Sequence, residues 1–182
     1  RYLQGSMFSG IHFTHSAQSI LLEGWADADY ASSILTRKST SGFVITLYGN
    51  PIYWKTKKQP IIAQLTTEAE FVAMNLCAKS LRWLSHLLLS LNRAIPTPTL
   101  YNDNSGAVII SKEAYLNPNT KHIDVCYQYL RNLVIDKLLV VKRVSSSEMI
   151  ADILNKPLNR NKVITALSQL KLIMLQSRRS VA

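Results

Sequence analysis

Residues 21–30 read LLEGWADADY, and this stretch decides the fold of the chain. Its apolar run predicts a strand that can be buried on both faces, and the acid Asp27 closes that run. A polar turn over residues 36–42 leads to the apolar run FVITLY at 43–48, and Gly49-Asn50-Pro51 is a strong turn signal before the next run. Residues 43–57 are therefore predicted to form a hairpin that follows the first strand.

The rest of the chain alternates between helical and strand patterns. A long helix is predicted from about residue 68 to 91, ending at Asn92. Apolar residues spaced i, i+4, i+7 and i+11 from Ile123 mark another helix. The remaining elements are a strand at 99–102, a helix at about 104–112, a loop at 113–119, a strand at 138–141, a helix at 148–154 and an amphipathic helix at about 160–175. This order predicts an α/β fold whose mixed sheet is antiparallel on one side and parallel on the other, with helices covering its faces.

The composition favours a single domain with a polyanionic partner. The chain has 182 residues, 47% of them hydrophobic, which is enough for a substantial core. Its 21 Lys and Arg against 11 Asp and Glu give a formal charge of +10, which favours nucleic acid over membrane; a merely soluble basic domain is the alternative. Cys77 and Cys126 lie inside helical patterns and are predicted to be buried thiols of a reducing compartment. No segment has the layout of a signal peptide or the length of a membrane span.

Four acids stand where apolar elements meet polar ones: Asp27, Glu70, Asp103 and Asp152. Asp27 and Asp103 each follow an apolar strand, so adjacent strands would place them side by side near one edge of the sheet. Repelling carboxylates are tolerated when divalent cations neutralise them, and hard oxygen ligands select Mg²⁺ or Mn²⁺. The set therefore indicates a metal site for phosphate chemistry. Taken singly, each strand acid is equally compatible with turn chemistry, and Asp152 with a solvated helix position.

The long helix offers two acids, and the helical period separates them. The face that contains Glu70 is apolar, with Met74 and Cys77 following it, so Glu70 is predicted to point toward the sheet. The face that contains Glu68 is mostly polar and is predicted to face solvent. Glu70 is thus the acid that can reach a strand-borne acid. The alternative is a capping box over residues 67–70, in which Glu70 satisfies the N-cap amide.

Several ordered motifs resemble those of a known family, the ribonuclease H domain of copia-type LTR retrotransposon polyproteins. The resemblance extends from Arg1 to about Leu158. The motifs are GWADADY at 24–30, RKSTSG at 37–42, KKQP at 57–60, TEAEF at 67–71, DN at 103–104, TKHID at 120–124 and ADILNKPL at 151–158. The chain departs from the family at residues 32–35, where acidic residues are usual, and like copia-type domains it lacks at 144–147 the His of cellular ribonucleases H.

The resemblance implies a ribonuclease H-like fold with a five-stranded mixed sheet, an antiparallel hairpin plus parallel strands, and helices on both faces. It implies an endonuclease that hydrolyses the RNA strand of RNA–DNA hybrids with two Mg²⁺ ions, or Mn²⁺, at the catalytic and metal-binding acids Asp27, Glu70, Asp103 and Asp152. Residues 1–20 would be a connection that follows a missing reverse transcriptase, residues 21–158 the ribonuclease H domain, and residues 159–182 an amphipathic helix with a basic tail. The partners would be the hybrid and the reverse transcriptase of the parent polyprotein, with no membrane. The expected location is the cytoplasm, in a virus-like particle for an active element, with the nucleus as an alternative.

Further candidates concern substrate binding and auxiliary chemistry. The lysines beside Trp54 are the best candidates for gripping a nucleic-acid backbone: Lys55, Lys57 and Lys58. Small polar groups are candidates for reading the 2′-hydroxyls of a hybrid: Thr40, Ser41 and Asn104. His122 and Asp124 are candidate auxiliary groups, with a role at a helix start as the alternative. The rival functions are a domesticated, non-catalytic remnant that binds nucleic acid or a protein, and a nuclease or transposase that acts on DNA.

Overall fold

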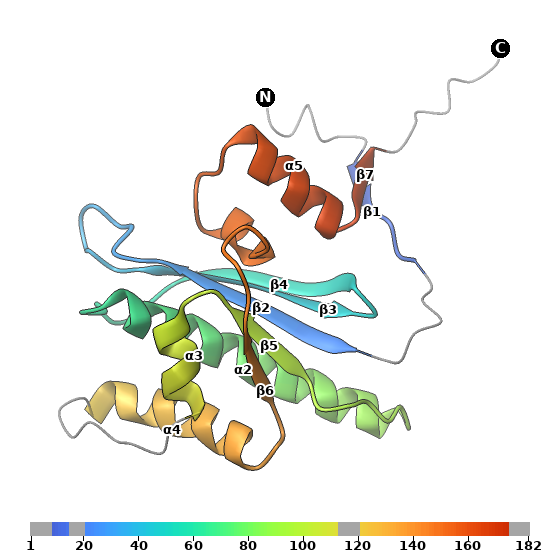
Figure 1. Cartoon of the computed structure of the whole chain (residues 1–182), viewed down its shortest axis with the longest axis horizontal. Helices are drawn as coiled ribbons and strands as arrows, with labels where there is room; N and C mark the ends of the chain where they lie inside the picture. Colours follow the sequence, from blue (N-terminus) through green and yellow to red (C-terminus); the bar gives the residue numbers. More distant parts are fainter. Residues whose placement is uncertain (1–8, 15–20, 113–120, 175–182) are drawn as a thin grey trace.

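The core of the protein is a five-stranded mixed sheet with strand order β4-β3-β2-β5-β6 (Figure 1). The computed structural model describes residues 9–14, 21–112 and 121–174, with backbone alone for 121–126 and 174. The central strand β2, Leu22–Asp29, pairs antiparallel with β3, Thr40–Leu47, which pairs antiparallel with β4, Asn50–Lys58. On its other side β2 pairs parallel with β5, Thr99–Asn102, which pairs parallel with β6, Val140–Arg143. The predicted mixed sheet, half antiparallel and half parallel, is confirmed.

The turn between β3 and β4 comes earlier than the sequence predicts, at residues 48–49 instead of 49–51. Tyr48 and Gly49 both have positive φ, at 53° and 67°, which is the pattern of a two-residue type I′ turn. Asn50 and Pro51 then belong to β4. Pro51 has no N–H to donate. Proline is tolerated here because β4 is an edge strand with no neighbouring strand on its outer side.

One face of the sheet is covered by the long helix α2, Thr66–Ser90, and the helices α3, Ser105–Lys112, and α4, Lys121–Ile135. Gly24 of β2 permits the closest approach, because a Cβ there would lie 2.6 Å from Cys77 Sγ and 2.8 Å from Leu81 Cδ1 of α2. The buried side chains of this layer are mostly apolar: Leu22, Ala26, Phe43, Ile45, Phe71, Met74, Leu81, Leu100, Leu130 and Val141. Cys77 is buried among them, as predicted, whereas the Cys126 side chain lies outside the described residues.

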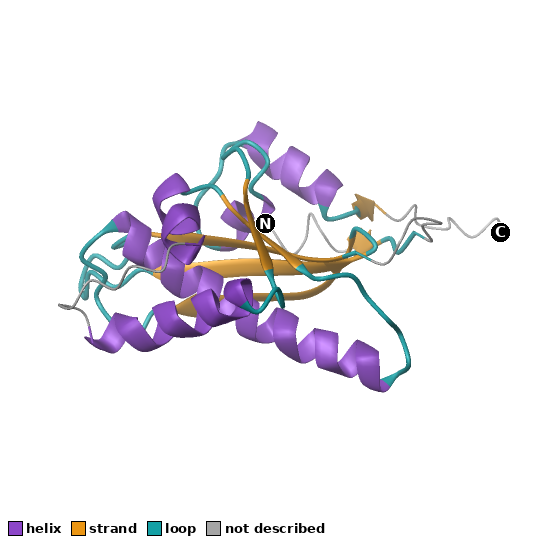
Figure 2. Cartoon of the chain, turned by 60° about the horizontal axis from the view of Figure 1, so that its bottom comes forward, coloured by secondary structure: helices purple, strands orange, loops and turns teal. Residues whose placement is uncertain are grey.

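The opposite face is covered by the short 3₁₀ helix η1, Ile150–Leu154, and the helix α5, Arg160–Gln169 (Figures 1 and 2). Val44 of β3 packs there with Ile150 and Leu170. Gly42 lets η1 approach the sheet, because a Cβ there would lie 3.1 Å from Leu154 Cβ and 3.2 Å from the Ala151 carbonyl oxygen. The expectation of helices on both faces is therefore confirmed.

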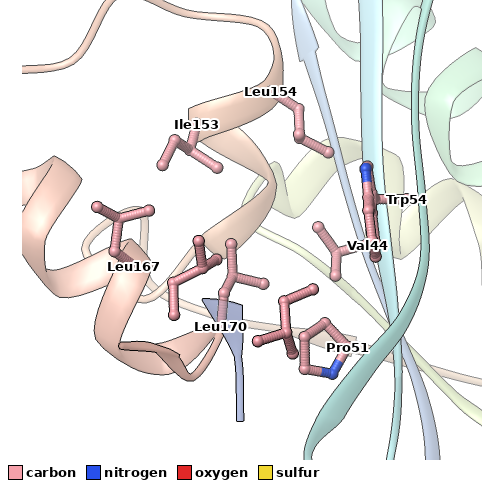
Figure 3. Close-up of a pocket in the computed structure, with 9 residues that line it drawn as sticks. Val44, Pro51, Trp54, Ile153, Leu154, Leu167 and Leu170 are labelled. Carbon is pink, nitrogen blue, oxygen red and sulfur yellow. The ribbon is translucent and has the colours of Figure 1, made fainter. Parts of the chain in front are cut away.

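The packing of α5 on the sheet is incomplete. A cavity of about 320 Å³ remains between β3, β4, η1 and the end of α5 (Figure 3). Apolar side chains line it, including Val44, Trp54, Ile153 and Leu170.

The C-terminal region differs from the sequence prediction. The predicted helix over about 160–175 ends at Gln169, because Lys171 adopts a left-handed conformation with φ 53° after the buried Leu170. The chain then forms β7, Leu172–Met174, which pairs antiparallel with β1, Ser9–Ile11. The element predicted at 148–154 is the 3₁₀ helix η1, and β6 begins two residues later than predicted. The loop at 113–119 and the basic tail lie outside the described residues, and the proposed domain limits stay a prediction.

None of the described helices combines the length and the apolarity that crossing a membrane requires.

The contact at Gly24 predicts a stability effect. Gly24→Ala should lower the free energy of unfolding by about 1–3 kcal/mol, because its methyl group overlaps Cys77 Sγ and Leu81. Urea denaturation would measure this change. Cys77→Ala is the matched control, and the double variant should lose less than the sum of the two single losses because Sγ is then absent. Strict additivity of the two losses would contradict the overlap.

Candidate active site

Three carboxylates meet at one edge of the sheet. Asp27 lies near the end of β2, and Asp103 follows β5 directly. Because β2 and β5 are parallel neighbours, their carboxyl ends bring both acids to the same edge. Glu70 reaches this edge from the first turns of α2. One carboxylate oxygen of each acid lies within 4.8 Å of those of the other two, and we call this group the acidic triad.

Glu70 is held in the acidic triad by two donors. Its Oε2 accepts hydrogen bonds from the Ala28 backbone N–H at 3.1 Å and from Asn102 Nδ2 at 2.9 Å. Asn102 is fully buried and also donates to the Ala26 carbonyl oxygen at 2.9 Å, so β2, β5 and α2 are joined at one amide. These contacts fix the side chain of Glu70 toward β2.

The alternative role of Glu70 in a capping box is wrong. The N-cap of α2 is Leu65, which makes no side-chain capping bond. Glu68 instead accepts from the Gln64 backbone N–H at 2.6 Å. Glu68 is also buried, at 6% exposure, so the prediction that its face points to solvent is wrong in the first half of α2, although Lys79 and His86 farther along are exposed. The N-terminal half of α2 is covered on nearly all sides, and an amphipathic pattern underestimates this burial.

Asp152 of η1 approaches the acidic triad through a lysine. Lys156 Nζ lies 2.7 Å from Asp27 Oδ2 and 3.0 Å from Asp152 Oδ1. Asn155 Nδ2 donates to the same Asp27 Oδ2 at 2.9 Å. Lys162 Nζ lies farther away, 3.8 Å from Asp152 Oδ2. The structure therefore brings Asp27, Glu70 and Asp103 directly together and places Asp152 beside them, across Lys156.

Burial raises the pKa of two carboxyl groups of the acidic triad, those of Asp27 and Glu70. Burial, followed by repulsion from Asp27, raises the pKa of Glu70 to about 8. Burial also raises the pKa of Asp27 to about 6, although Lys156 opposes that rise. Burial lowers the pKa of Lys156, but the hydrogen bonds and charges of Asp27 and Asp152 outweigh this and hold it above its ordinary value. Lys156 is consequently a cation at neutral pH.

The acidic triad fits a divalent cation. Asp27 Oδ1 is buried and has no hydrogen-bond partner among the described residues. A buried, unpaired carboxylate oxygen is costly unless a proton or a cation satisfies it. Oxygen donors in a compact group are the ligands that Mg²⁺ and Mn²⁺ prefer. Asp27, Glu70 and Asp103 could thus hold one such ion, with Asp152 near a second position.

Asp103 is the most accessible acid of the triad, and a serine loop contacts it. Ser146 Oγ donates to Asp103 Oδ2 at 2.6 Å. Ser145 in turn donates to Glu148 Oε2. The loop after β6 therefore places hydroxyl groups beside the most accessible acid of the site.

The lysines predicted to bind nucleic acid lie on the exposed edge strand β4. Lys55, Lys57 and Lys58 are exposed, as is the neighbouring Trp54. Lys58 Nζ donates to Ser33 Oγ at 2.7 Å. Since Lys58 pairs with Thr40 across the hairpin and Thr40 pairs with Asp29, the three strands end together near Asp27. These charges can therefore accompany a phosphate backbone that reaches the acidic triad.

The small polar candidates occupy different environments. Thr40 is half-buried, and its hydroxyl lies 3.0 Å from Ser32 Oγ. Ser41 is buried, and its hydroxyl accepts from Gln59 Nε2 at 2.9 Å. Asn104 caps α3, since its Oδ1 accepts from the Ala107 backbone N–H at 3.0 Å.

The auxiliary candidates His122 and Asp124 belong to α4, but their side chains lie outside the described residues and their roles stay predictions.

Four residues that contact the acids of the site were not predicted from the sequence: Asn102, Asn155, Lys156 and Ser146. Asn102 could have been predicted from the sequence. Side chains alternate along a strand, so Asn102, the residue before Asp103, points to the opposite face of the sheet. Asn155 and Lys156 lie inside the motif ADILNKPL, and Lys156 stands four residues after Asp152. Ser146 carries no such signal, because its contact depends on the path of a loop.

Sequence comparisons relate the chain to polyproteins of plant transposons. No protein-family model matches the chain. The chain is 37% identical over 162 residues to the retrovirus-related Pol polyprotein from transposon TNT 1-94 of Nicotiana tabacum, a match that covers 89% of this chain and 12% of the relative. It is 34% identical over 161 residues to that of transposon RE1 of Arabidopsis thaliana, covering 88% of this chain and 11% of the relative. The chain therefore spans about a ninth of these relatives.

Solved structures share the fold at low sequence identity. LC11-RNase H1 from compost has a TM-score of 0.54 and 16% identity, with 82% of this chain and 98% of that chain covered. The same protein in complex with RNA/DNA hybrid has a TM-score of 0.52 and 14% identity, with 74% and 93% covered. The chain therefore has a ribonuclease H-like fold. Among proteins of this fold, the chain is a homologue of one segment of the retrovirus-related Pol polyproteins from plant transposons, as the motifs indicated.

The raised pKa of Glu70 predicts how stability depends on pH. In the folded, metal-free protein the pKa of Glu70 is about 8 against an ordinary 4.5, so the native state holds a proton that the unfolded chain has released. The free energy of unfolding should therefore fall as the pH rises from about 5 to about 8. Glu70→Gln keeps an oxygen acceptor but has no proton to release, so it should weaken this fall. Near pH 8 the free energy of unfolding of the variant should exceed that of the wild type by on the order of 3 kcal/mol.

Urea denaturation in EDTA across this pH range measures the effect. If the free energy of unfolding of Glu70→Gln equalled that of the wild type at every pH, the raised pKa of Glu70 would be contradicted.

Proposed function

We propose that the chain is a metal-dependent endonuclease that hydrolyses the RNA strand of RNA–DNA hybrids during the reverse transcription of a retrotransposon. The observation that carries this proposal is the acidic triad, which lies at the ends of two parallel strands. Within it, Asp27 Oδ1 is buried and has no hydrogen-bond partner among the described residues. The fold similarity to LC11-RNase H1, solved with an RNA/DNA hybrid, and the Pol polyprotein relatives support the same substrate.

The four acids would hold two Mg²⁺ ions, with Mn²⁺ as an alternative: Asp27, Glu70, Asp103 and Asp152. When bound, such ions polarise the scissile phosphate and lower the pKa of a water molecule. Asn102 and the Ala28 amide hold Glu70 in place, so little reorganisation is needed at that ligand. In-line attack would leave 5′-phosphate and 3′-hydroxyl ends.

The hybrid would lie across the end of the sheet, with its backbone along β4. Lys55, Lys57 and Lys58 would neutralise phosphates, and Trp54 offers an exposed stacking surface. Thr40 and Asn104 are nearest to the strand ends that carry the acids and are the candidates for contact with 2′-hydroxyls. The buried Ser41 would support the hairpin instead.

The reverse transcriptase of a parent polyprotein is the proposed protein partner, and the cytoplasm or a virus-like particle the proposed location, with the nucleus as an alternative. The rival function is a domesticated remnant that binds hybrid without cutting it. A nuclease acting on duplex DNA is the second rival. A cleavage assay distinguishes all three.

Cleavage of a labelled hybrid should require Asp103. The wild-type chain with Mg²⁺ is expected to cut the RNA strand, and Asp103→Asn should reduce the rate by about 100-fold or more, because it removes a charged ligand while keeping the side-chain shape. Asp136→Asn is the matched control, since Asp136 is an exposed acid at the end of α4, outside the acidic triad. Binding of the hybrid without cleavage by the wild type would favour the remnant, and cleavage of duplex DNA in preference to hybrid would favour the second rival.

The lysines of β4 should govern the salt dependence of binding. Replacing Lys55, Lys57 and Lys58 by Gln should weaken hybrid binding and reduce the slope of log K against log salt concentration by about 2 to 3, since each phosphate contact contributes about 0.9. Fluorescence anisotropy at several salt concentrations measures the slope. Lys137→Gln is the control, because this exposed lysine precedes β6 at the opposite end from the site. Equal slopes for the triple variant and the control would exclude this binding surface.

A further inference from the structure

Lys156 occupies the space between two acids of the site. Its Nζ lies 2.7 Å from Asp27 Oδ2 and 3.0 Å from Asp152 Oδ1. Asp27 is fully buried and Asp152 is 5% exposed, whereas the lysine side chain is 30% exposed. One ammonium group is therefore shared by two carboxylates that have little access to water.

The backbone after η1 builds this position. The N–H groups of Asn155 and Lys156 both point at the Asp152 carbonyl oxygen, at 3.2 Å and 3.0 Å. This tight turn returns the lysine side chain over the acid four residues earlier. Gly42 lets η1 lie close to β3, because any Cβ there would meet Leu154. The lysine is thus placed by the fold and not by a loose surface contact.

The two oxygens of Asp27 have different surroundings. Oδ2 accepts from both Lys156 and Asn155. Oδ1 is buried and has no partner among the described residues. The acidic triad of Asp27, Glu70 and Asp103 excludes Asp152. Asp27 therefore faces a fixed positive charge on one side and an unsatisfied position on the other.

We propose that Lys156 is the resident cation of the Asp27–Asp152 pair, so that the substrate-free protein takes up one divalent ion, at the acidic triad. A second ion can enter between Asp27 and Asp152 only when the ammonium group leaves. Lys156 is in this sense a positioning residue, which holds Asp27 and Asp152 together and sets how many ions the free protein binds. The inference deepens the proposed function and rests on its metal site.

A purely structural ion pair would give a different result. Such a pair would affect the stability of the folded chain but not the number of ions bound. Since a unit charge a few ångströms from a divalent ion interacts strongly in a partly buried site, a resident ammonium should exclude a second ion. Metal stoichiometry therefore separates the two roles.

The test is a titration of the full chain with Mn²⁺, without nucleic acid, in which the electron paramagnetic resonance signal of free Mn²⁺ counts the bound ions. The wild type should bind one ion, with any second ion at least about 100-fold weaker. Lys156→Met keeps the side-chain length without the charge and should bind two ions of comparable affinity. Lys156→Arg restores the charge and should return the count to one. Lys162→Met is the matched control, because Lys162 is near Asp152 but not Asp27, and it should leave the count at one.

Two results would overturn the inference. One is a wild type that binds two ions with similar affinity, and the other is a Lys156→Met variant that is folded by circular dichroism and still binds one ion. If Lys156→Met does not fold, Lys156→Gln carries the decision, because it removes the charge and keeps a hydrogen-bond donor: it should bind two ions, and a folded Lys156→Gln variant that binds one would overturn the inference. Failure of the proposed function looks different, since a chain that binds one Mn²⁺ but leaves hybrid uncut refutes the nuclease and keeps the role of Lys156.

Discussion

The structure depends on keeping mutually repelling carboxylates buried at one edge of the sheet. Asp27 is fully buried and Glu70 nearly so, and the charge of Asp27 raises the cost of ionising Glu70. The fold offsets this repulsion with Asn102 and the Ala28 amide at Glu70, and with Lys156 at Asp27. What remains unsatisfied, Asp27 Oδ1, is the part of the site suited to a cation. Burying these acids lowers the free energy of unfolding of the chain, and it holds the oxygen ligands of the site in position for a cation.

Two glycines set the distances on which that ligand set relies. Gly24 lets α2, which carries Glu70, approach one face of the central sheet, and Gly42 lets η1, which carries Asp152, approach the other. This close packing lets Glu70 join Asp27 in the acidic triad and lets Asp152 share Lys156 with Asp27. The pocket beside α5 lies apart from these contacts and is lined by apolar side chains such as Val44 and Leu170 (Figure 3).

Much of this arrangement could be predicted from the sequence, for identifiable reasons. The central strand, the hairpin and the parallel strands follow from apolar runs and turn signals, and the parallel pairing of β2 and β5 brings Asp27 and Asp103 together as expected. The burial of Glu68 was missed, because amphipathicity describes a helix with one covered face and the N-terminal half of α2 is enclosed on nearly all sides. The pairing of β1 with β7 was missed because runs of three residues carry no detectable period. Contacts of Lys156 and Ser146 depend on backbone turns that composition does not encode.

The separation of the site residues along the chain has a consequence for biosynthesis. Asn155 donates to Asp27 across 128 positions, and the four acids come from four successive parts of the chain. A nascent chain can form the β2–β3–β4 meander and α2 early, but the last acid and its lysine leave the ribosome only near the end of the domain. Interrupted synthesis would thus release a partly folded and incomplete site, so that the full set of four acids is assembled only in a chain translated beyond Lys156.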